Sequence, residues 1–253
     1  MRPRLMTHDS TCKNCGATLS GNFCANCGQT SEIHRVTFGH FAHEFFHAFT
    51  HTDKGILLLM KELITRPGYV AKEYLDGKRK KYFNPLTFLI ILSSVFALAS
   101  HYSGYYEALS FKSPEKMHPL HKETLELMYA SGKVINLFLM PVLISFFSWI
   151  FFRKQKNNLA ENLVLSSFVM GQIYIIMIVI FIPGHLLFPG TTQLNNNVFH
   201  ILMLVYMTIA YHQFFKNNIF LSALKSVLIT LLFIVFFWLS LIAFVILRHM
   251  VLG

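Results

Sequence analysis

Charge is what this sequence has least of. Only 13% of the 253 residues are Asp, Glu, Lys or Arg, whereas 54% are hydrophobic. A soluble domain usually carries about 25% charged residues, so the shortage argues against an ordinary globular domain and predicts segments that span a bilayer. The stretch 1–31 also lacks the apolar central region of a signal peptide, and we expect no signal peptide to be cleaved from it.

Acidic and basic residues are missing from the middle of every long apolar run. Each run approaches or exceeds the roughly 20 residues that a bilayer requires. We therefore predict an all-α polytopic membrane protein with about five transmembrane helices in the bundle 83–253. Ion-coupled transporters usually need an ionisable group at mid-depth, which disfavours that class. The predicted spans are 83–103, 134–152, 163–182, 198–215 and 221–247.

Cysteine is absent after residue 27, which excludes a disulfide framework spread over the chain. The four thiols form two CxxC pairs, each followed by a glycine. Two such turns complete a closed shell of four thiolates, which is typical of a structural Zn²⁺ site in a reducing compartment. Two fortuitous pairs or a redox dithiol are the alternatives. We predict a zinc ribbon over 12–30, after a disordered lead at 1–11, with the metal ligands Cys12, Cys15, Cys24 and Cys27.

A candidate helix over 37–52 opens an interfacial helical collar that we expect to cover residues 37–82. At about 100° per residue its polar side chains form one stripe opposite phenylalanines, which is typical of an amphipathic helix at a membrane surface. The stripe comprises His40, His43, Glu44, His47 and His51.

The same helix contains an HExxH sequence at 43–47. In zinc hydrolases of this type the two histidines bind the metal and the glutamate activates water. Here His43 and His47 would bind, His51 or His40 would be a third ligand, and Glu44 would be catalytic. A surface stripe that senses pH or binds metal weakly is the alternative that the helical spacing favours.

Basic residues gather next to the first predicted span, in the run Lys78, Arg79, Lys80 and Lys81. Positive clusters stay on the cytoplasmic side and attract anionic lipid headgroups. We therefore predict lipid-headgroup contacts for these four residues and no binding of nucleic acid, although the net charge is +10. The same rule predicts that the N-terminus is cytoplasmic and that the C-terminus lies on the opposite side of the membrane.

Several short motifs resemble a known family. They are the predicted ribbon, the segment 51–55, Arg66-Pro67-Gly68, the basic run before Pro85, the start of the third span at 159–164, and Tyr211. Together they resemble the bacterial zinc-ribbon, multi-pass membrane proteins catalogued as domain of unknown function 3667. The chain has Asn162 and Ser167 where the family often has histidines. The resemblance implies a multi-pass architecture in the bacterial inner membrane, which would place the C-terminus in the periplasm, and it brings no activity with it.

We interpret the protein as a non-enzymatic scaffold. Its cytoplasmic ribbon would bind a protein partner and its collar would contact membrane lipids, and a homo-oligomer is compatible with the sequence. The alternatives are a membrane-embedded zinc hydrolase and a transporter or lipid-handling protein. A wide polar cavity between the spans would favour the last of these, whereas a tightly packed apolar bundle would argue against it.

Overall fold

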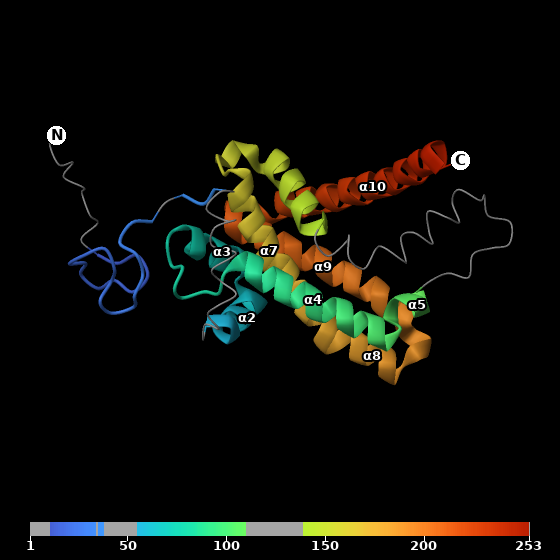
Figure 1. Ribbon diagram of the computed structural model, residues 1–253, viewed down its shortest axis with the longest axis horizontal. Coiled ribbons are helices and arrows are strands. Elements are labelled where there is room, and N and C mark those ends of the chain that lie inside the picture. Colours follow the sequence, from blue (N-terminus) through green and yellow to red (C-terminus); the bar gives the residue numbers. More distant parts are fainter. Residues whose placement is uncertain (1–10, 34, 38–54, 110–138, 253) are drawn as a thin grey trace.

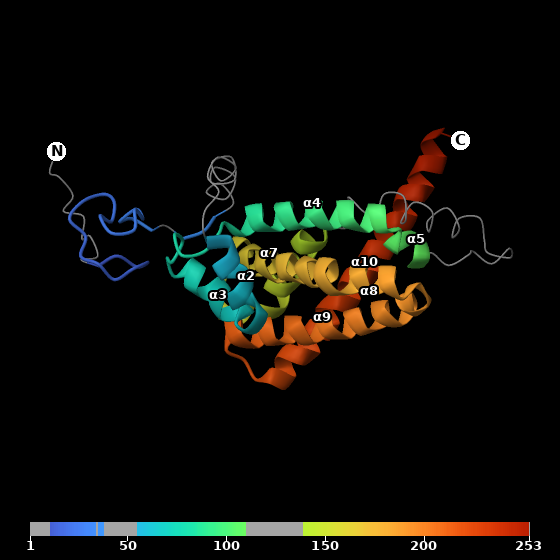
Figure 2. The same cartoon turned by 90° about the horizontal axis from the view of Figure 1, so that it is seen from below.

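The computed structural model describes residues 11–33, 35–37, 55–109 and 139–252. Within them the regular structure is helical, and the only extended pairings are the isolated bridges Thr11–Thr18 and Phe23–Thr30 in the cysteine ribbon, residues 11–33. The ribbon lies at one end of a helical bundle (Figures 1 and 2). The predicted 37–52 helix falls almost wholly outside the described residues, as do most of the disordered lead and the first part of the second span.

Two short helices, α2 (Gly55–Thr65) and α3 (Pro67–Leu75), form the described part of the collar. Pro67 occupies the first turn of α3, where its missing N–H costs no hydrogen bond. Both helices are held against α9 (Thr192–Phe215) by polar contacts. The Tyr206 hydroxyl donates to the Leu63 carbonyl at 2.7 Å, and the Gln213 amide accepts from Gly68 N–H at 3.1 Å and donates to the Thr65 carbonyl at 3.0 Å.

The first span, α4 (Pro85–Ser103), has well-defined ends. The Asn84 side chain accepts from the N–H groups of Leu86 and Thr87, which satisfies two donors at the start of the helix. Gly104 ends it with a φ of 67°, a left-handed conformation that glycine adopts without strain. A short helix, α5 (Tyr105–Leu109), follows directly.

The centre of the bundle is α7 (Leu159–Ile176), which starts with a capping box between Asn158 and Glu161. In an apolar window of 18 residues within the span that α7 opens, Leu159–Leu187, 72% of the residues are buried inside the chain, against 22% in the corresponding window of α10 (Ile219–Leu252). Helices α4 and α7 pack closely at Gly171, where an added Cβ would lie 2.4 Å from the Phe88 ring. α7 is therefore the helix on which the others pack, and α10 exposes most of its surface to its surroundings.

The third span is longer than the sequence indicated. The sequence predicts a break in the helix after residue 182, where the third predicted span ends, but α7 continues through a π-helical turn, η2 (Met177–Phe181), into α8 (Ile182–Leu187). Pro183 lacks an N–H and its ring crowds the carbonyl four residues earlier. The wider turn accommodates this, because Ile182 N–H bonds back to the Met177 carbonyl. The predicted break is therefore wrong.

Hydropathy also placed the start of the fourth span too late. After η3 (Pro189–Thr191), α9 starts at Thr192, although the polar residues that follow are outside the apolar run. The backbone hydrogen bonds of a helix also form where the side chains are polar, but a hydropathy window detects only the apolar residues. Likewise α10 extends beyond both ends of its predicted 221–247.

In the described part of the chain, four helical segments are long and apolar enough to cross a membrane: Pro85–Ser103, Leu159–Leu187, Pro189–Phe215 and Ile219–Arg248. This supports a multi-pass membrane protein. The predicted second span is described only from residue 139, and residues 139–152 are helical. The count of five spans therefore stays a prediction.

The helix directions give the bundle two ends. At the ribbon end, α4, α7 and α10 begin and α9 finishes, and at the far end α4 finishes and α9 begins (Figure 2). The ribbon-end loops contact one another, since the Gln155 amide donates to Asn217 at 3.0 Å. Lys225 reaches back to the Phe151 carbonyl at 2.9 Å and lies 4.2 Å from the Phe152 ring centre. Lysine and arginine thus gather at the ribbon end, with Arg153, Lys154 and Lys156 in or beside the short turn η1 (Arg153–Gln155).

Candidate metal centre

The ribbon consists of two copies of one turn. In the first, Cys12 N–H donates to the Ala17 carbonyl and Gly16 N–H to the Cys12 carbonyl. In the second, Cys24 and Gly28 make the equivalent bonds at 2.8 Å. Both glycines have positive φ, 76° and 71°, which the tight turn requires. This repeated backbone geometry directs both thiols of each CxxC toward the same point.

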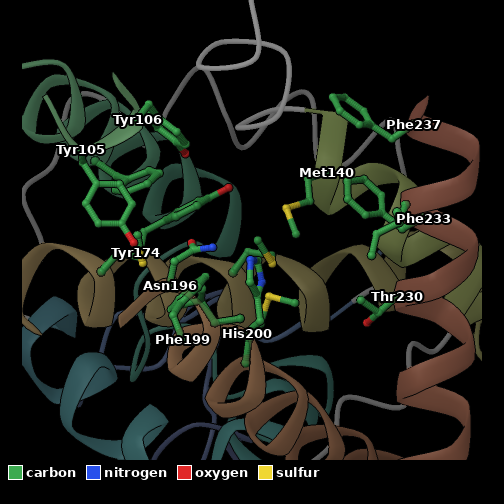
Figure 3. A pocket seen from close by; sticks show the side chains of 16 residues that line it. Tyr105, Tyr106, Met140, Tyr174, Asn196, Phe199, His200, Thr230, Phe233 and Phe237 are labelled. Atoms are coloured by element: carbon green, nitrogen blue, oxygen red, sulfur yellow. The ribbon is translucent and has the colours of Figure 1, made fainter. Parts of the chain in front are cut away.

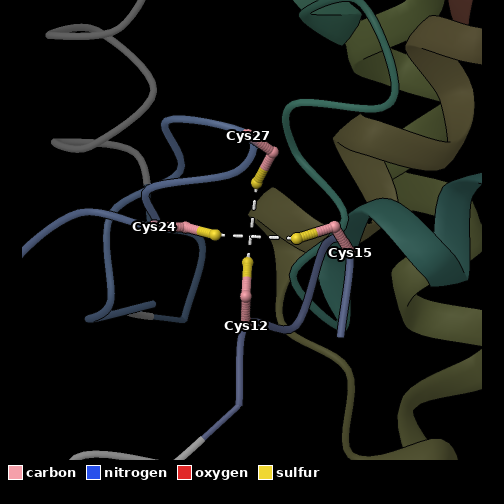
Figure 4. Close-up of side chains that lie close together, drawn as sticks. All are labelled: Cys12, Cys15, Cys24 and Cys27. Atoms are coloured by element: carbon pink, nitrogen blue, oxygen red, sulfur yellow. Dashed lines mark hydrogen bonds between the residues drawn. The ribbon is translucent and has the colours of Figure 1, made fainter. Parts of the chain in front are cut away.

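The four sulfur atoms converge on a space that a metal ion would fill (Figure 4). Cys12 and Cys27 lie 3.6 Å apart at Sγ, as do Cys15 and Cys24, and all four atoms lie within 4.8 Å of one another. Ligands at about 2.3 Å from a tetrahedral Zn²⁺ would be about 3.8 Å apart. Disulfide sulfurs are bonded at about 2.05 Å, and all four cysteines are free. The arrangement therefore fits a metal ion rather than a disulfide.

The thiols differ in acidity because their surroundings differ. The Ala17 backbone and the Asn26 side chain hydrogen-bond to Cys15 and lower the pKa of its thiol to about 6. Burial raises the pKa of Cys27 to about 11. A bound cation would stabilise the thiolate form of all four and release the remaining protons. A closed shell of thiolates leaves no open coordination position, so such a site would stabilise the fold.

One side of the ribbon packs on the basic loop, residues 77–82. The Gln29 side chain is 3% exposed, donates to the Gly77 carbonyl at 2.7 Å and accepts from the N–H groups of Arg79 and Lys80. Asn14 accepts from Lys81 N–H at 3.0 Å. Gly77 has a φ of 118°, and an added Cβ would lie 2.7 Å from the Ile33 side chain. The ribbon therefore fixes the backbone of the basic loop.

Beneath the loop lies a cluster of charges that joins α2 to α3. Glu73 pairs with Arg66 at 2.7 Å, with Lys78 at 3.1 Å and with Lys81 at 3.2 Å. Lys81 also pairs with Glu62 at 3.2 Å. The buried Tyr82 hydroxyl lies 2.8 Å from Glu62 and 2.9 Å from Glu73, and Lys81 donates to it at 2.7 Å. Burial raises the pKa of Glu73, but its bonds to Tyr82, Lys78 and Lys81 outweigh burial and bring it down to about 2.

Glu73 should make the fold sensitive to acid. Because its pKa in the folded chain lies below the ordinary value of about 4.3, its contribution is complete above pH 4.3 and is lost as the pH falls through about 2. After allowance for solvent screening we expect about 1–2 kcal/mol. Melting of the detergent-solubilised chain should show Glu73→Gln destabilised at pH 7 but approaching wild type near pH 2. Asp76→Asn, at an exposed carboxylate, is the control, and an equal deficit of Glu73→Gln at both pH values would contradict the assignment.

Comparison with known proteins gives one result. Residues 53–97 match the family model described as a protein of unknown function, DUF3667. The match confirms the resemblance over these residues. No curated protein and no solved structure matches the chain.

The DUF3667 match covers α2, α3, the basic loop and most of α4. It therefore includes Arg66, Gly68 and the carboxylates of the charge cluster, whereas the ribbon lies outside it. The structure gives the motif residues physical roles. Arg66 pairs with Glu73, Gly68 contacts α9, and Gly77 lies where the ribbon meets the loop.

The other predicted site residues have different outcomes. His43, Glu44, His47 and His51 lie outside the described residues, so the hydrolase interpretation stays a prediction. Of the predicted lipid-binding residues, Lys78 and Lys81 pair with Glu73, while Lys80 is exposed. Lipid contact by the basic loop also stays a prediction.

Sequence reasoning missed the residues that join distant parts of the chain. Arg35, between the ribbon and the collar, pairs with Glu161 at 2.6 Å and donates to the Lys156 carbonyl at 2.9 Å. Asn158 donates to the Val36 carbonyl at 3.0 Å. No local pattern marks such pairs. The only available signal was the position of Glu161, an acidic residue at the start of an apolar span.

Proposed function

We propose that this integral membrane protein is a non-enzymatic scaffold of the bacterial inner membrane. In this proposal the cysteine ribbon holds Zn²⁺, lies in the cytoplasm and keeps the basic loop against anionic headgroups, and the C-terminus is periplasmic. One observation carries the proposal, namely that Gln29 and Asn14 of the ribbon bind the backbone of the basic loop. Such contacts fix the loop, and the Lys80 side chain is exposed.

The distribution of charge supports the orientation. Basic residues follow the second predicted span and precede the third, at Arg153, Lys154 and Lys156, and Lys216 lies between α9 and α10. All these positions are at the ribbon end. At the far end, residues 182–197 contain no lysine or arginine. They comprise α8, η3 and the first turns of α9. Under the positive-inside rule the ribbon end is cytoplasmic, where a reducing environment would keep the thiols available for zinc.

Lipid selectivity tests the scaffold proposal. In nanodiscs that mix phosphatidylglycerol with phosphatidylcholine, the full chain should retain phosphatidylglycerol preferentially, as counted by native mass spectrometry. Lys80→Gln should lower that preference about fivefold, since one cation near an anionic surface contributes about 1 kcal/mol. Lys80→Arg keeps the charge and should keep the preference. Equal lipid retention by all three proteins would refute headgroup binding at this loop.

The exposed side of the ribbon is where we place a protein partner. Phe23 is 63% exposed there and offers the kind of aromatic side chain that often anchors a protein interface. A photoreactive residue in place of Phe23 should give a discrete cross-linked product in cells, and Cys24→Ser should abolish it. The same residue in place of Tyr102, which is 84% exposed on α4, is the control. Identical products from both positions would indicate non-specific collision.

A further inference from the structure

The bundle encloses a partly open cavity of about 270 Å³ near its far end (Figure 3). Its walls come from α4, α5, α7, α9 and α10 and from the helix at 139–152. Most lining side chains are aromatic residues, methionines or isoleucines. Along α7 the lining runs to Met177, where the π-helical turn η2 starts, and such turns are frequent at functional sites.

A few polar groups interrupt the apolar walls. Figure 3 shows Tyr105, Asn196 and His200 toward one side of the cavity and Thr230, Phe233 and Phe237 on the other. Asn196 and His200 are one helical turn apart on α9, and His200 is the more accessible residue of the two. Polar groups that converge on an otherwise apolar pocket are the usual composition of a small-molecule site.

Two of these groups have no hydrogen-bond partner. The Tyr105 hydroxyl belongs to a side chain that is 1% exposed, and neither it nor the Thr230 hydroxyl is bonded to another described residue. A buried hydroxyl without a partner has lost its bonds to water and gained none in return, and most buried polar groups in proteins are paired. A ligand with a hydrogen-bonding group would satisfy the Tyr105 hydroxyl at the far end, where α4 finishes and α9 begins.

The lining also determines the charge and size of a suitable ligand. None of the sixteen described residues that line the cavity is Asp, Glu, Lys or Arg, so an ionised head group would lose its hydration without gaining a counter-charge. An apolar cavity of about 150 Å³ holds benzene, so this volume suits an apolar group of about ten carbon atoms. The ligand should therefore be neutral, largely apolar and of moderate length.

We propose that this cavity binds an uncharged, single-chain amphiphile with a hydroxyl head group. The hydroxyl lies against Tyr105 and Asn196, and the chain extends between Met140, Phe233 and Phe237. His200, at the accessible side, offers a second polar contact. This site is independent of the ribbon and of the scaffold proposal, which concern the opposite end of the bundle.

The experiment is photolabelling of the full chain in phosphatidylcholine nanodiscs with a diazirine-bearing ten-carbon alcohol. Labelling mapped by mass spectrometry should be saturable and should fall on the cavity walls. Unlabelled 1-decanol should compete, and decanoate at pH 8 should compete at least tenfold less well. Labelling that does not saturate, or equal competition by the anion, would overturn the proposal.

Variants locate the site. Thr230→Phe fills the cavity and should lower labelling at least tenfold, whereas Leu232→Phe, at a 41% exposed position of the same helix, should leave it unchanged. Tyr105→Phe should weaken competition by 1-decanol about two- to tenfold without affecting a decane probe, because only the hydroxyl contact is lost.

An enlarging variant keeps the test decisive if Thr230→Phe does not fold. Phe233→Ala should shift the preferred alcohol to chains several carbon atoms longer. Unchanged labelling in Thr230→Phe, or an unchanged chain-length preference in Phe233→Ala, would show that the probe binds elsewhere.

Discussion

Replacing Gly68 with alanine should lower the stability of the whole chain by about 3 kcal/mol or more. The added Cβ would lie 2.3 Å from the Ala210 carbonyl oxygen and 2.5 Å from the Phe214 nitrogen. Both are backbone atoms of α9, which cannot rotate away as a side chain could, so α3 would have to move outward. That movement would break the bond from Gly68 to Gln213, and strain from overpacking adds to the loss.

Thermal melting in nanodiscs measures this effect. Gly190→Ala is a matched control, since an added Cβ there meets nothing within 4 Å. It should melt within a degree or two of wild type. If Gly68→Ala melted like Gly190→Ala, the close contact between α3 and α9 would be disproved.

Removing the metal should unfold the ribbon and release the basic loop. We expect Cys24→Ser to lose bound zinc, because binding free energies of about 10–16 kcal/mol hold such small units in their folded form. The amides of Arg79, Lys80 and Lys81 donate to Gln29 and Asn14. Their hydrogen exchange should therefore accelerate about tenfold or more, measured by mass spectrometry with residue-level fragmentation.

Neighbouring amides provide the internal control. Asp76 and Lys78 donate within the collar, to the carbonyls of Lys72 and Glu73, and their exchange should not change. Gln29→Ala should retain zinc yet expose Arg79 and Lys80 while leaving Lys81 protected by Asn14. This account would be contradicted if gently purified wild-type chain contained no zinc. It would also be contradicted if the amide hydrogen-exchange rates at residues 79–81 were the same with and without the metal.

Local patterns in the sequence predicted that the four cysteines lie close together. The doubled CxxC with its glycines indicated where four sulfurs would converge, because the turn geometry is contained within a few residues. The class of fold followed from low charge and long apolar runs, which reflect the solvent around the chain rather than any particular contact.

Hydropathy was less informative about where helices begin and end. It measures the apolar part of a helix, so it missed the polar first turns of α9 and the passage of α7 through Pro183. The helix continues through Pro183 because the chain forms a wider, π-helical turn just before it. No residue type in the sequence indicates that such a turn will form.

The contacts that join the ribbon to the bundle were not predictable from local pattern. Gln29 and Gly77 are 48 residues apart, and Arg35 and Glu161 are 126 apart. Each pair consists of residue types that occur on any polar surface. The sequence likewise predicted lipid contacts for all four cations of the basic loop, whereas Lys78 and Lys81 form ion pairs with Glu73. These pairs depend on how α2 and α3 pack together, and no local pattern indicates that packing.

The contact of the collar with α9 has a consequence for synthesis on the ribosome. Gly68 and its partner Gln213 are separated by 145 residues. At about 5–20 residues per second, that separation corresponds to roughly 7–30 s of translation. During this interval α3, whose Val70 and Ala71 are fully buried in the finished chain, lacks the helix on which Gly68 packs. The membrane surface is the nearest apolar phase that could cover Val70 and Ala71, so the collar would rest there before the fourth span arrives.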